Sequence, residues 1–198
     1  MSLESLNLDL FSILNVPEQA SPLMMHFATF VAHDLVYLLI TCFALFWFYG
    51  HQNSKALILK AFIFCCVALS ISEVASYLFN TPRPFVMHVG QTLIAHEATG
   101  SFPSNHMTIF SSIAFAYYFS ARRDIGRFLL AVAWLVAWSR IYVGVHFPVD
   151  MAGAFILSWA VNFTGLKLWN HYQTKLMCRV MLLYEKLFSA LIQRGLIK

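Results

Sequence analysis

Three short groups of polar residues in this otherwise apolar chain have the composition of a phosphate-binding site that contains a nucleophile. They are Arg83-Pro84, Pro103-Ser104-Asn105-His106, and Ser139-Arg140 followed by His146 and Asp150. Together they offer two guanidinium groups for oxyanions, a hydroxyl group, two imidazoles, and a carboxylate to orient one of these imidazoles. The set predicts nucleophilic phosphoryl chemistry, and it needs no metal ion to complete it.

Spacing within these groups indicates what each side chain can do. His146 and Asp150 are four residues apart, and a hydrogen bond between them would fix the imidazole tautomer and leave the other ring nitrogen free to attack. His106 suits an acid–base role, because its pKa can lie near working pH. Pro103 and Ser104 precede an apolar run, so the free backbone N–H groups of a helix beginning there would face an anion.

The composition of the chain predicts that lipid surrounds it. Of 198 residues, 60% are hydrophobic and 11% are charged, whereas a soluble domain averages about 25% charged residues. The net charge of +4 therefore bears on membrane topology and gives no support to nucleic-acid binding. Residues 1 to 54 contain no Lys or Arg, which argues against a signal peptide. The four cysteines lack metal-type spacing, so neither a disulfide nor a zinc site is expected.

Apolar runs long enough to cross a bilayer predict an all-α, polytopic membrane helix bundle forming a single domain over residues 1–198. About 20 apolar residues are needed for each transmembrane helix, and five runs qualify: Leu23–Tyr49, Ala56–Phe79, Pro103–Ala121, Ile125–Gly144 and Phe147–Leu166. These give a transmembrane core over residues 23–168. Residues 1–20 are expected to lie along the interface, and residues 170–198 to form a basic amphipathic tail, with a sixth span left open.

The distribution of Lys and Arg predicts the orientation of the bundle. With five spans, eleven of the thirteen basic residues fall on one side, which we assign to the cytoplasm. They are Lys55, Lys60, Arg122, Arg123, Arg127, Lys167, Lys175, Arg179, Lys186, Arg194 and Lys198. Only Arg83 and Arg140 fall outside, so each needs a chemical explanation. The chemical groups then converge on the outer face.

The three groups, in this order and spacing, resemble the signature motifs of the type 2 phosphatidic acid phosphatase family. The motifs lie between Arg83 and Asp150. The chain looks most like the bacterial undecaprenyl diphosphate phosphatases of the bacitracin-resistance type. The likeness lies in its length, its interfacial N-terminal segment and the sequence Ser101-Phe102-Pro103-Ser104-Asn105-His106. The resemblance implies a helical membrane hydrolase without a metal ion or other cofactor.

The resemblance also implies a role for each motif residue. His146 would be the nucleophile that forms a phosphohistidine, and Asp150 would orient it. His106 would protonate the leaving oxygen and then activate water. The phosphoryl oxygens would be bound by Arg83, Ser104 and Arg140. Beyond the resemblance, the backbone N–H near Asn105 is a further expected phosphate donor, and His96, Glu97, Ser139 and Pro84 are candidate substrate contacts, although Ser139 is better suited to shaping the turn.

The first motif departs from the family pattern at one position. The family has a Lys seven residues before the Arg, and this chain has Ser76 there. Neither Glu73 nor Lys60 is a simple substitute, so the second phosphate of a diphosphate would be held by other donors such as His88, His96 or backbone N–H groups.

The expected function is hydrolysis of undecaprenyl diphosphate to undecaprenyl phosphate and inorganic phosphate, which would recycle the lipid carrier of bacterial cell-wall peptidoglycan. The enzyme would lie in the bacterial inner membrane, with its site facing the periplasm and its partners being membrane lipids. Two alternatives remain open: a phosphatidic acid or phosphatidylglycerophosphate phosphatase with the same residues, and a non-catalytic protein that binds lipid phosphate. The oligomeric state is not predicted.

Overall fold

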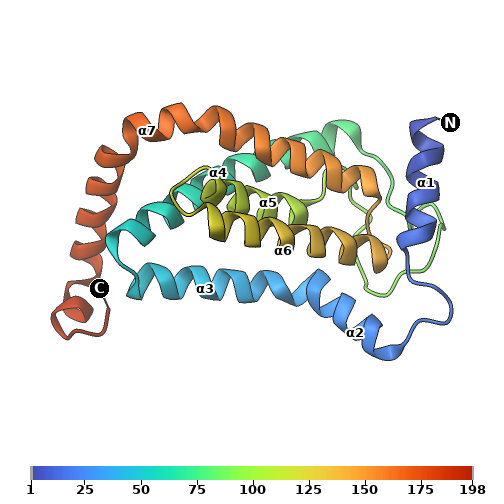
Figure 1. The fold of residues 1–198 in the computed structure, drawn as a ribbon, viewed down its shortest axis with the longest axis horizontal. Helices are drawn as coiled ribbons and strands as arrows, with labels where there is room; N and C mark the ends of the chain where they lie inside the picture. The colour runs from blue at the N-terminus through green and yellow to red at the C-terminus, as the bar shows by residue number, and fades with distance from the viewer. Residues whose placement is uncertain (1, 198) are drawn as a thin grey trace.

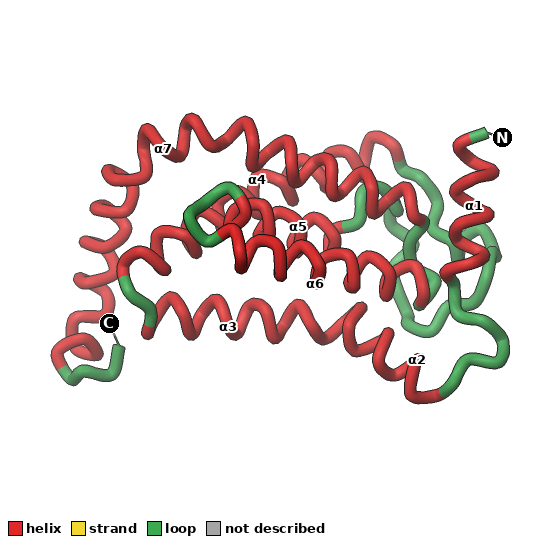
Figure 2. The backbone as a smooth tube through the Cα atoms, in the orientation of Figure 1, coloured by secondary structure: helices red, strands yellow, loops and turns green. Residues whose placement is uncertain are grey.

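The computed structural model describes residues 2–197 and is helical throughout its regular elements, as Figures 1 and 2 show. Met1 and Lys198, the latter counted among the basic residues of the predicted tail, lie outside the described residues. The elements are α1 (Leu3–Leu14), α2 (Pro22–Thr29), the π-helical turn η1 (Phe30–Asp34), α3 (Leu35–Tyr49), α4 (Gln52–Phe79), α5 (Asn105–Tyr118), α6 (Arg123–Tyr142) and α7 (Pro148–Gln193). The all-α prediction is confirmed.

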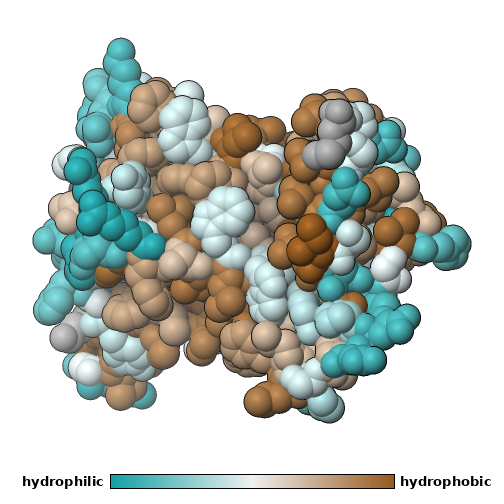
Figure 3. Space-filling view, turned by 45° about the vertical axis from the view of Figure 1, so that its right-hand side comes forward, coloured by the Kyte–Doolittle hydropathy of each residue, from teal (hydrophilic) through white to brown (hydrophobic). Residues whose placement is uncertain are grey.

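Long apolar helices lie side by side along one direction, as a polytopic membrane bundle requires (Figure 1). Four helical stretches among residues 2–197 are long and apolar enough to cross a membrane: Pro22–Tyr49, Gln52–Phe79, Arg123–Tyr142 and Pro148–Gln193. Their outward side chains form an apolar band between two hydrophilic ends (Figure 3). A bilayer would solvate this band, since it leaves large hydrophobic side chains such as Phe62, Phe128 and Leu168 exposed.

The predicted span Pro103–Ala121 is wrong in length, because α5 covers only Asn105–Tyr118. Fourteen residues of α-helix extend about 21 Å, which is less than the roughly 30 Å of a hydrocarbon core. α5 does not need that length, since α4, α6 and α7 all pack against it and keep it away from lipid. Because α5 is enclosed by other helices, it can carry hydroxyl side chains without exposing them to lipid, and Thr108, Ser111 and Ser112 are fully buried.

Both ends of α5 are fixed by long-range hydrogen bonds. At its N-terminus the Ser104 amide donates to the Asp150 carbonyl oxygen at 3.3 Å. At its C-terminus the buried ammonium group of Lys60 donates to the carbonyl oxygens of Ala116 and Phe119, at 3.0 and 3.2 Å. A cation is stabilised at a helix C-terminus, where carbonyl groups lack intrahelical partners. Lys60 therefore closes the helix that carries His106 at its other end.

The fifth predicted span and the tail form one long helix, α7, where two separate elements were expected; its only internal break is a kink at Phe188. No Pro or Gly occurs between residues 166 and 193, so nothing in the sequence ends the helix at residue 166. Figure 1 shows α7 following the bundle and then bending across its end. Its last part packs there through aromatic contacts of Tyr184 with Trp47 and of Phe188 with Phe48.

α1 lies across the opposite end of the bundle, as the predicted interfacial segment would (Figure 1). Phe11 is fully buried and packs edge-on against Phe147, with ring centroids 5.1 Å apart. Asn15, directly after α1, donates to the carbonyl oxygens of Gln91 and Tyr142 and accepts from the Gln91 amide. These bonds attach the N-terminal segment to the loop between α4 and α5 and to the end of α6.

The contacts of Lys60 generate a stability prediction. Lys60→Met removes the donors that satisfy two carbonyl oxygens at the end of α5, and a buried unsatisfied polar group costs about 1–3 kcal/mol. We expect a lower midpoint of thermal unfolding in detergent micelles than for the wild type. Lys167→Met, at an exposed position of α7, is the matched control and should change the midpoint little. Equal midpoints for the two variants would contradict the capping role of Lys60.

Candidate active site

The predicted polar groups meet at the end of the bundle covered by α1. The end of α4, the loop of residues 80–104, the N-terminus of α5, the end of α6 and the turn before α7 surround a cavity of about 320 Å³. Its lining residues are Glu73, Ser76, Arg83, His96, Glu97, Thr99, Gly100, Pro103, Asn105, His106, Arg140 and His146. Side chains separated by more than 70 residues in the sequence thus share one cavity, which is polar and lies at a single end of the bundle.

His146 lies in the turn between α6 and α7 and is almost completely buried. Its Nδ1 is 3.2 Å from the Asp150 carboxylate, and its Nε2 is 3.0 Å from an Nη1 group of Arg83. A guanidinium can only donate and a carboxylate can only accept, so the hydrogen of the neutral ring belongs on Nδ1. Burial lowers the pKa of His146 to about 3, against the opposing effect of Asp150. The ring is therefore neutral at pH 7, and the lone pair of Nε2 faces the cavity side.

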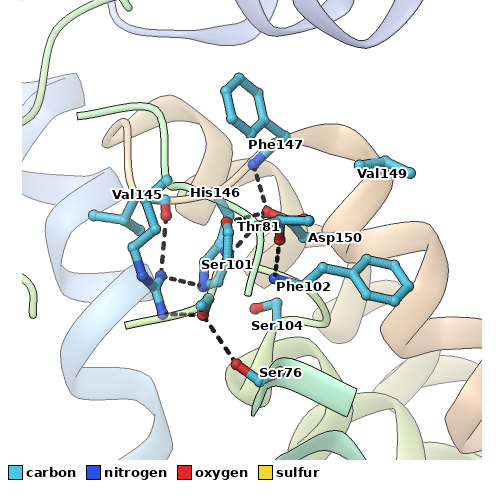
Figure 4. Close-up of polar contacts among 12 residues, drawn as sticks. Ser76, Thr81, Ser101, Phe102, Ser104, Val145, His146, Phe147, Val149 and Asp150 are labelled. Atoms are coloured by element: carbon cyan, nitrogen blue, oxygen red, sulfur yellow. Dashed lines mark hydrogen bonds and ion pairs between the residues drawn. The ribbon is translucent and has the colours of Figure 1, made fainter. Parts of the chain in front are cut away.

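Asp150, in the first turn of α7, accepts three hydrogen bonds on one carboxylate oxygen (Figure 4). The donors are the His146 ring, the Phe147 backbone amide at 2.8 Å and the Ser101 hydroxyl. The bond from Phe147 also closes the N-terminus of α7, where acidic side chains are stabilised. Asp150 is 1% exposed, so these donors replace water around its charge.

Arg83 is held by the backbone on both sides of the cavity. Its guanidinium donates to the carbonyl oxygens of Thr99, Gly100 and Val145, at 3.0–3.1 Å. Burial lowers its pKa, while the charge of Asp150 raises it. These bonds fix the direction of the guanidinium toward His146, although Arg83 comes from a loop.

Arg140, in the last turn of α6, is buried with most of its donors unused. One Nη1 bond reaches the Ala32 carbonyl oxygen at 3.1 Å, and neither Nε nor Nη2 has a partner within residues 2–197. The buried hydroxyl of Ser104 also has no partner there. Buried donors are almost always satisfied, so unpaired donors beside a cavity indicate that a hydrogen-bond acceptor binds there. An oxyanion has the charge and the lone pairs for this position.

Other predicted contacts divide into residues that line the cavity and residues that do not. His96 and Glu97 line it, and the His96 ring lies edge-on to His146 at a centroid distance of 6.2 Å. Burial lowers the pKa of His96. Ser139 and Pro84 do not line the cavity. Ser139 is buried within α6 and donates to the Val136 carbonyl oxygen, as a residue that shapes the helix end would.

Asn105 lines the cavity, but its amide group is directed toward α4. It donates to the Glu73 carboxylate and accepts from the Ser72 hydroxyl at 2.9 Å. The side-chain amide of Asn105 is thus engaged by α4, and a phosphate contact of its backbone N–H stays a prediction. Ser76, at the position where the family pattern has Lys, donates to the Gly100 carbonyl oxygen at 3.2 Å. The loop lies so close here that a Cβ atom at Gly100 would be 2.6 Å from the Ser76 oxygens.

Ser101 has no assigned role in the sequence analysis, and the structure places it in direct contact with Asp150 and His146. Thr99 was also missed, and its hydroxyl accepts from Arg83 at 3.3 Å. In the sequence, the feature that could have pointed to Thr99 and Ser101 is their position just before the group that begins at Pro103. His88, considered as a substitute phosphate donor, does not line the cavity.

Comparison with known proteins shows extensive similarity. Residues 56–174 match the PAP2 superfamily. The chain is 33% identical to "Putative undecaprenyl-diphosphatase YbjG" of Escherichia coli over 99% of both chains. It is 37% identical to "Undecaprenyl-diphosphatase BcrC" of Bacillus subtilis over 67% of this chain and 65% of that one. The crystal structure of Aquifex aeolicus LpxE superposes with a TM-score of 0.65 at 27% identity, covering 84% of this chain and 99% of the other.

The unpaired donors of Arg140 generate a binding prediction. Orthovanadate, a phosphate analogue, should raise the unfolding midpoint of the detergent-solubilised wild type, because a ligand at 100 times its Kd stabilises by about 2.7 kcal/mol. Arg140→Lys should lose most of this increment, since Lys cannot reproduce the planar guanidinium donors. Arg127→Lys, exposed near the other end of α6, is the control and should retain it. A full vanadate increment in Arg140→Lys would show that the anion does not bind at Arg140.

Proposed function

Because this chain belongs to the PAP2 superfamily, we propose that it hydrolyses undecaprenyl diphosphate to undecaprenyl phosphate and inorganic phosphate. The observation that carries the proposal is the buried Arg83–His146–Asp150 arrangement beside the unpaired donors of Arg140. It joins a neutral nucleophile to guanidinium donors that are free to bind an oxyanion. The names of relatives from Escherichia coli and Bacillus subtilis support the choice of undecaprenyl diphosphate.

In the proposed reaction, the lone pair of His146 Nε2 attacks the terminal phosphorus of the diphosphate. The bond from phosphorus to the bridging oxygen breaks, and His106 gives a proton to the departing lipid phosphate. Water then attacks the phosphohistidine while His106 accepts its proton, and inorganic phosphate leaves. Arg83 must give up its bond to Nε2 as phosphorus approaches, and its guanidinium is then available to the phosphoryl oxygens.

The outer face of the bundle is the proposed location of the cavity. The last part of α7 lies at the opposite end of the bundle (Figure 1). This part carries the positively charged residues Lys175, Arg179 and Lys186, and Arg194 comes directly after it. A cytoplasmic position for that end follows from the positive-inside rule. The site would then open to the periplasm, with the apolar band of the bundle beside the polyprenyl chain and the cations of the cavity around the diphosphate.

Phosphate release is the direct test. Purified wild-type protein in detergent should release phosphate from undecaprenyl diphosphate with excess chelator present, whereas His146→Ala should be slower by at least about 1,000-fold, since the nucleophile is gone. His171→Ala, exposed on α7, should retain wild-type rates.

Phosphatidic acid and phosphatidylglycerophosphate in the same detergent serve as competing substrates. Preferential turnover of either glycerolipid would overturn the substrate assignment. Absence of phosphate release from all three lipids, by protein that still binds them, would favour the non-catalytic alternative.

Orientation has its own test in intact cells. In a variant without the four native cysteines, Glu97→Cys places a thiol at the cavity and Lys175→Cys places one near the opposite end. A membrane-impermeant maleimide should label position 97 from outside and position 175 only after the cells are opened. The reverse pattern would place the cavity in the cytoplasm.

A further inference from the structure

Ser101 lies behind the proposed nucleophile, outside the three motif groups. Its side chain is fully buried, and its Oγ donates to the Asp150 carboxylate while lying 3.3 Å from His146 Nδ1. Its backbone amide donates to the Thr81 carbonyl oxygen at 2.9 Å, which fixes the loop at this point. Ser101 does not line the cavity, whereas His146 does. It is therefore placed to act on the histidine and not on the substrate.

We propose that Ser101 is a positioning residue that holds Asp150 and, together with it, restricts His146 to the tautomer with hydrogen on Nδ1. The proposal rests on the hydrolysis proposed above for its effect on rate. Its effect on the tautomer of His146 is a property of the protein without substrate.

Hydrogen-bond directions carry this inference. The Ser101 hydroxyl has one hydrogen, which goes to the Asp150 carboxylate, so its lone pairs are left toward His146 Nδ1. Nδ1 then faces two acceptors and no donor. The other tautomer would place a lone pair of Nδ1 against these two oxygens and an N–H group of Nε2 against the N–H of Arg83. Both contacts are repulsive, and both disappear when the hydrogen is on Nδ1.

Ser101 also matters during the reaction. When phosphorus bonds to Nε2, the ring becomes positively charged, and the N–H of Nδ1 becomes a stronger donor. Asp150 and Ser101 are both in place to accept from it. Because these groups are oriented before the substrate arrives, they need no reorganisation as charge develops. The expected consequence of removing the hydroxyl is a lower kcat with little change in KM.

The kinetic test compares three variants. Ser101→Ala should lower kcat by about 10–100-fold, the range expected for loss of one hydrogen bond to a charged group, with KM within about twofold. Ser101→Thr keeps the hydroxyl and should recover most of the loss. Ser70→Ala removes a hydroxyl that bonds only within α4, to the Cys66 carbonyl oxygen, and does not line the cavity, so it should leave kcat unchanged.

A double-mutant cycle separates positioning from simple destabilisation. In an Asp150→Ala background, Ser101→Ala should cost less than about twofold, because Ser101 would no longer have the carboxylate to hold. The same loss in both backgrounds would overturn the proposal, as would wild-type kcat in Ser101→Ala.

A second readout does not depend on activity. Nitrogen-15 NMR of histidine-labelled protein in detergent reports the tautomer of each ring, and the His146 signals are those missing from His146→Gln. We expect the neutral tautomer protonated on Nδ1 in the wild type and a shifted Nδ1 signal in Ser101→Ala, because this N–H loses one acceptor and Asp150 is no longer held by the Ser101 hydroxyl. If the wild type releases no phosphate from any lipid, the proposed function fails, and this spectrum still decides the role of Ser101. An unchanged His146 signal in Ser101→Ala would overturn it.

Discussion

The arrangement of the site depends on the hydrogen bonds that the carboxylate of Asp150 accepts. One carboxylate oxygen accepts hydrogen bonds from the Ser101 hydroxyl in the loop before α5, and from the His146 ring and the Phe147 backbone amide in the turn before α7. The backbone carbonyl of the same residue accepts from Ser104, where α5 begins. A buried carboxylate is costly unless donors surround it, so the need to satisfy this one charge holds the loop before α5 against the turn between α6 and α7.

Buried cations impose a second constraint, and the two arginines meet it differently. Arg83 uses its donors on carbonyl oxygens of Thr99, Gly100 and Val145, which makes it a brace between the loop and the turn. Arg140 uses one donor on Ala32, and its Nε and Nη2 atoms have no hydrogen-bond partner in the described part of the chain. Arg83 therefore stabilises the backbone around the site, whereas Arg140 offers unpaired donors to the cavity. A bound anion would complete the hydrogen bonds that the protein leaves open.

The site keeps its shape because α5 is enclosed and fixed at both ends. Lys60 satisfies its last carbonyl groups, and the Ser111–Ser158 and Asn162–Ser112 hydrogen bonds join it to α7 along the bundle. Such polar contacts between helices specify one packing arrangement where apolar surfaces alone would permit several. α5 and α7 carry His106 and Asp150, so their fixed packing sets the separation of the proposed acid–base group and the residue that orients the nucleophile.

The sequence by itself determined the all-α membrane class, since so few charges and so many apolar residues leave lipid as the only adequate solvent. It also identified His146, Asp150, Arg83 and Arg140, because their residue types and order are informative without coordinates. Only the tertiary structure decided that α5 is short, that the amide of Asn105 is directed toward Glu73, and that Ser101 contacts Asp150. The physical reason is that these features depend on partners more than 30 residues away in the chain, and hydrophobic periodicity reports only which face of a local segment is apolar.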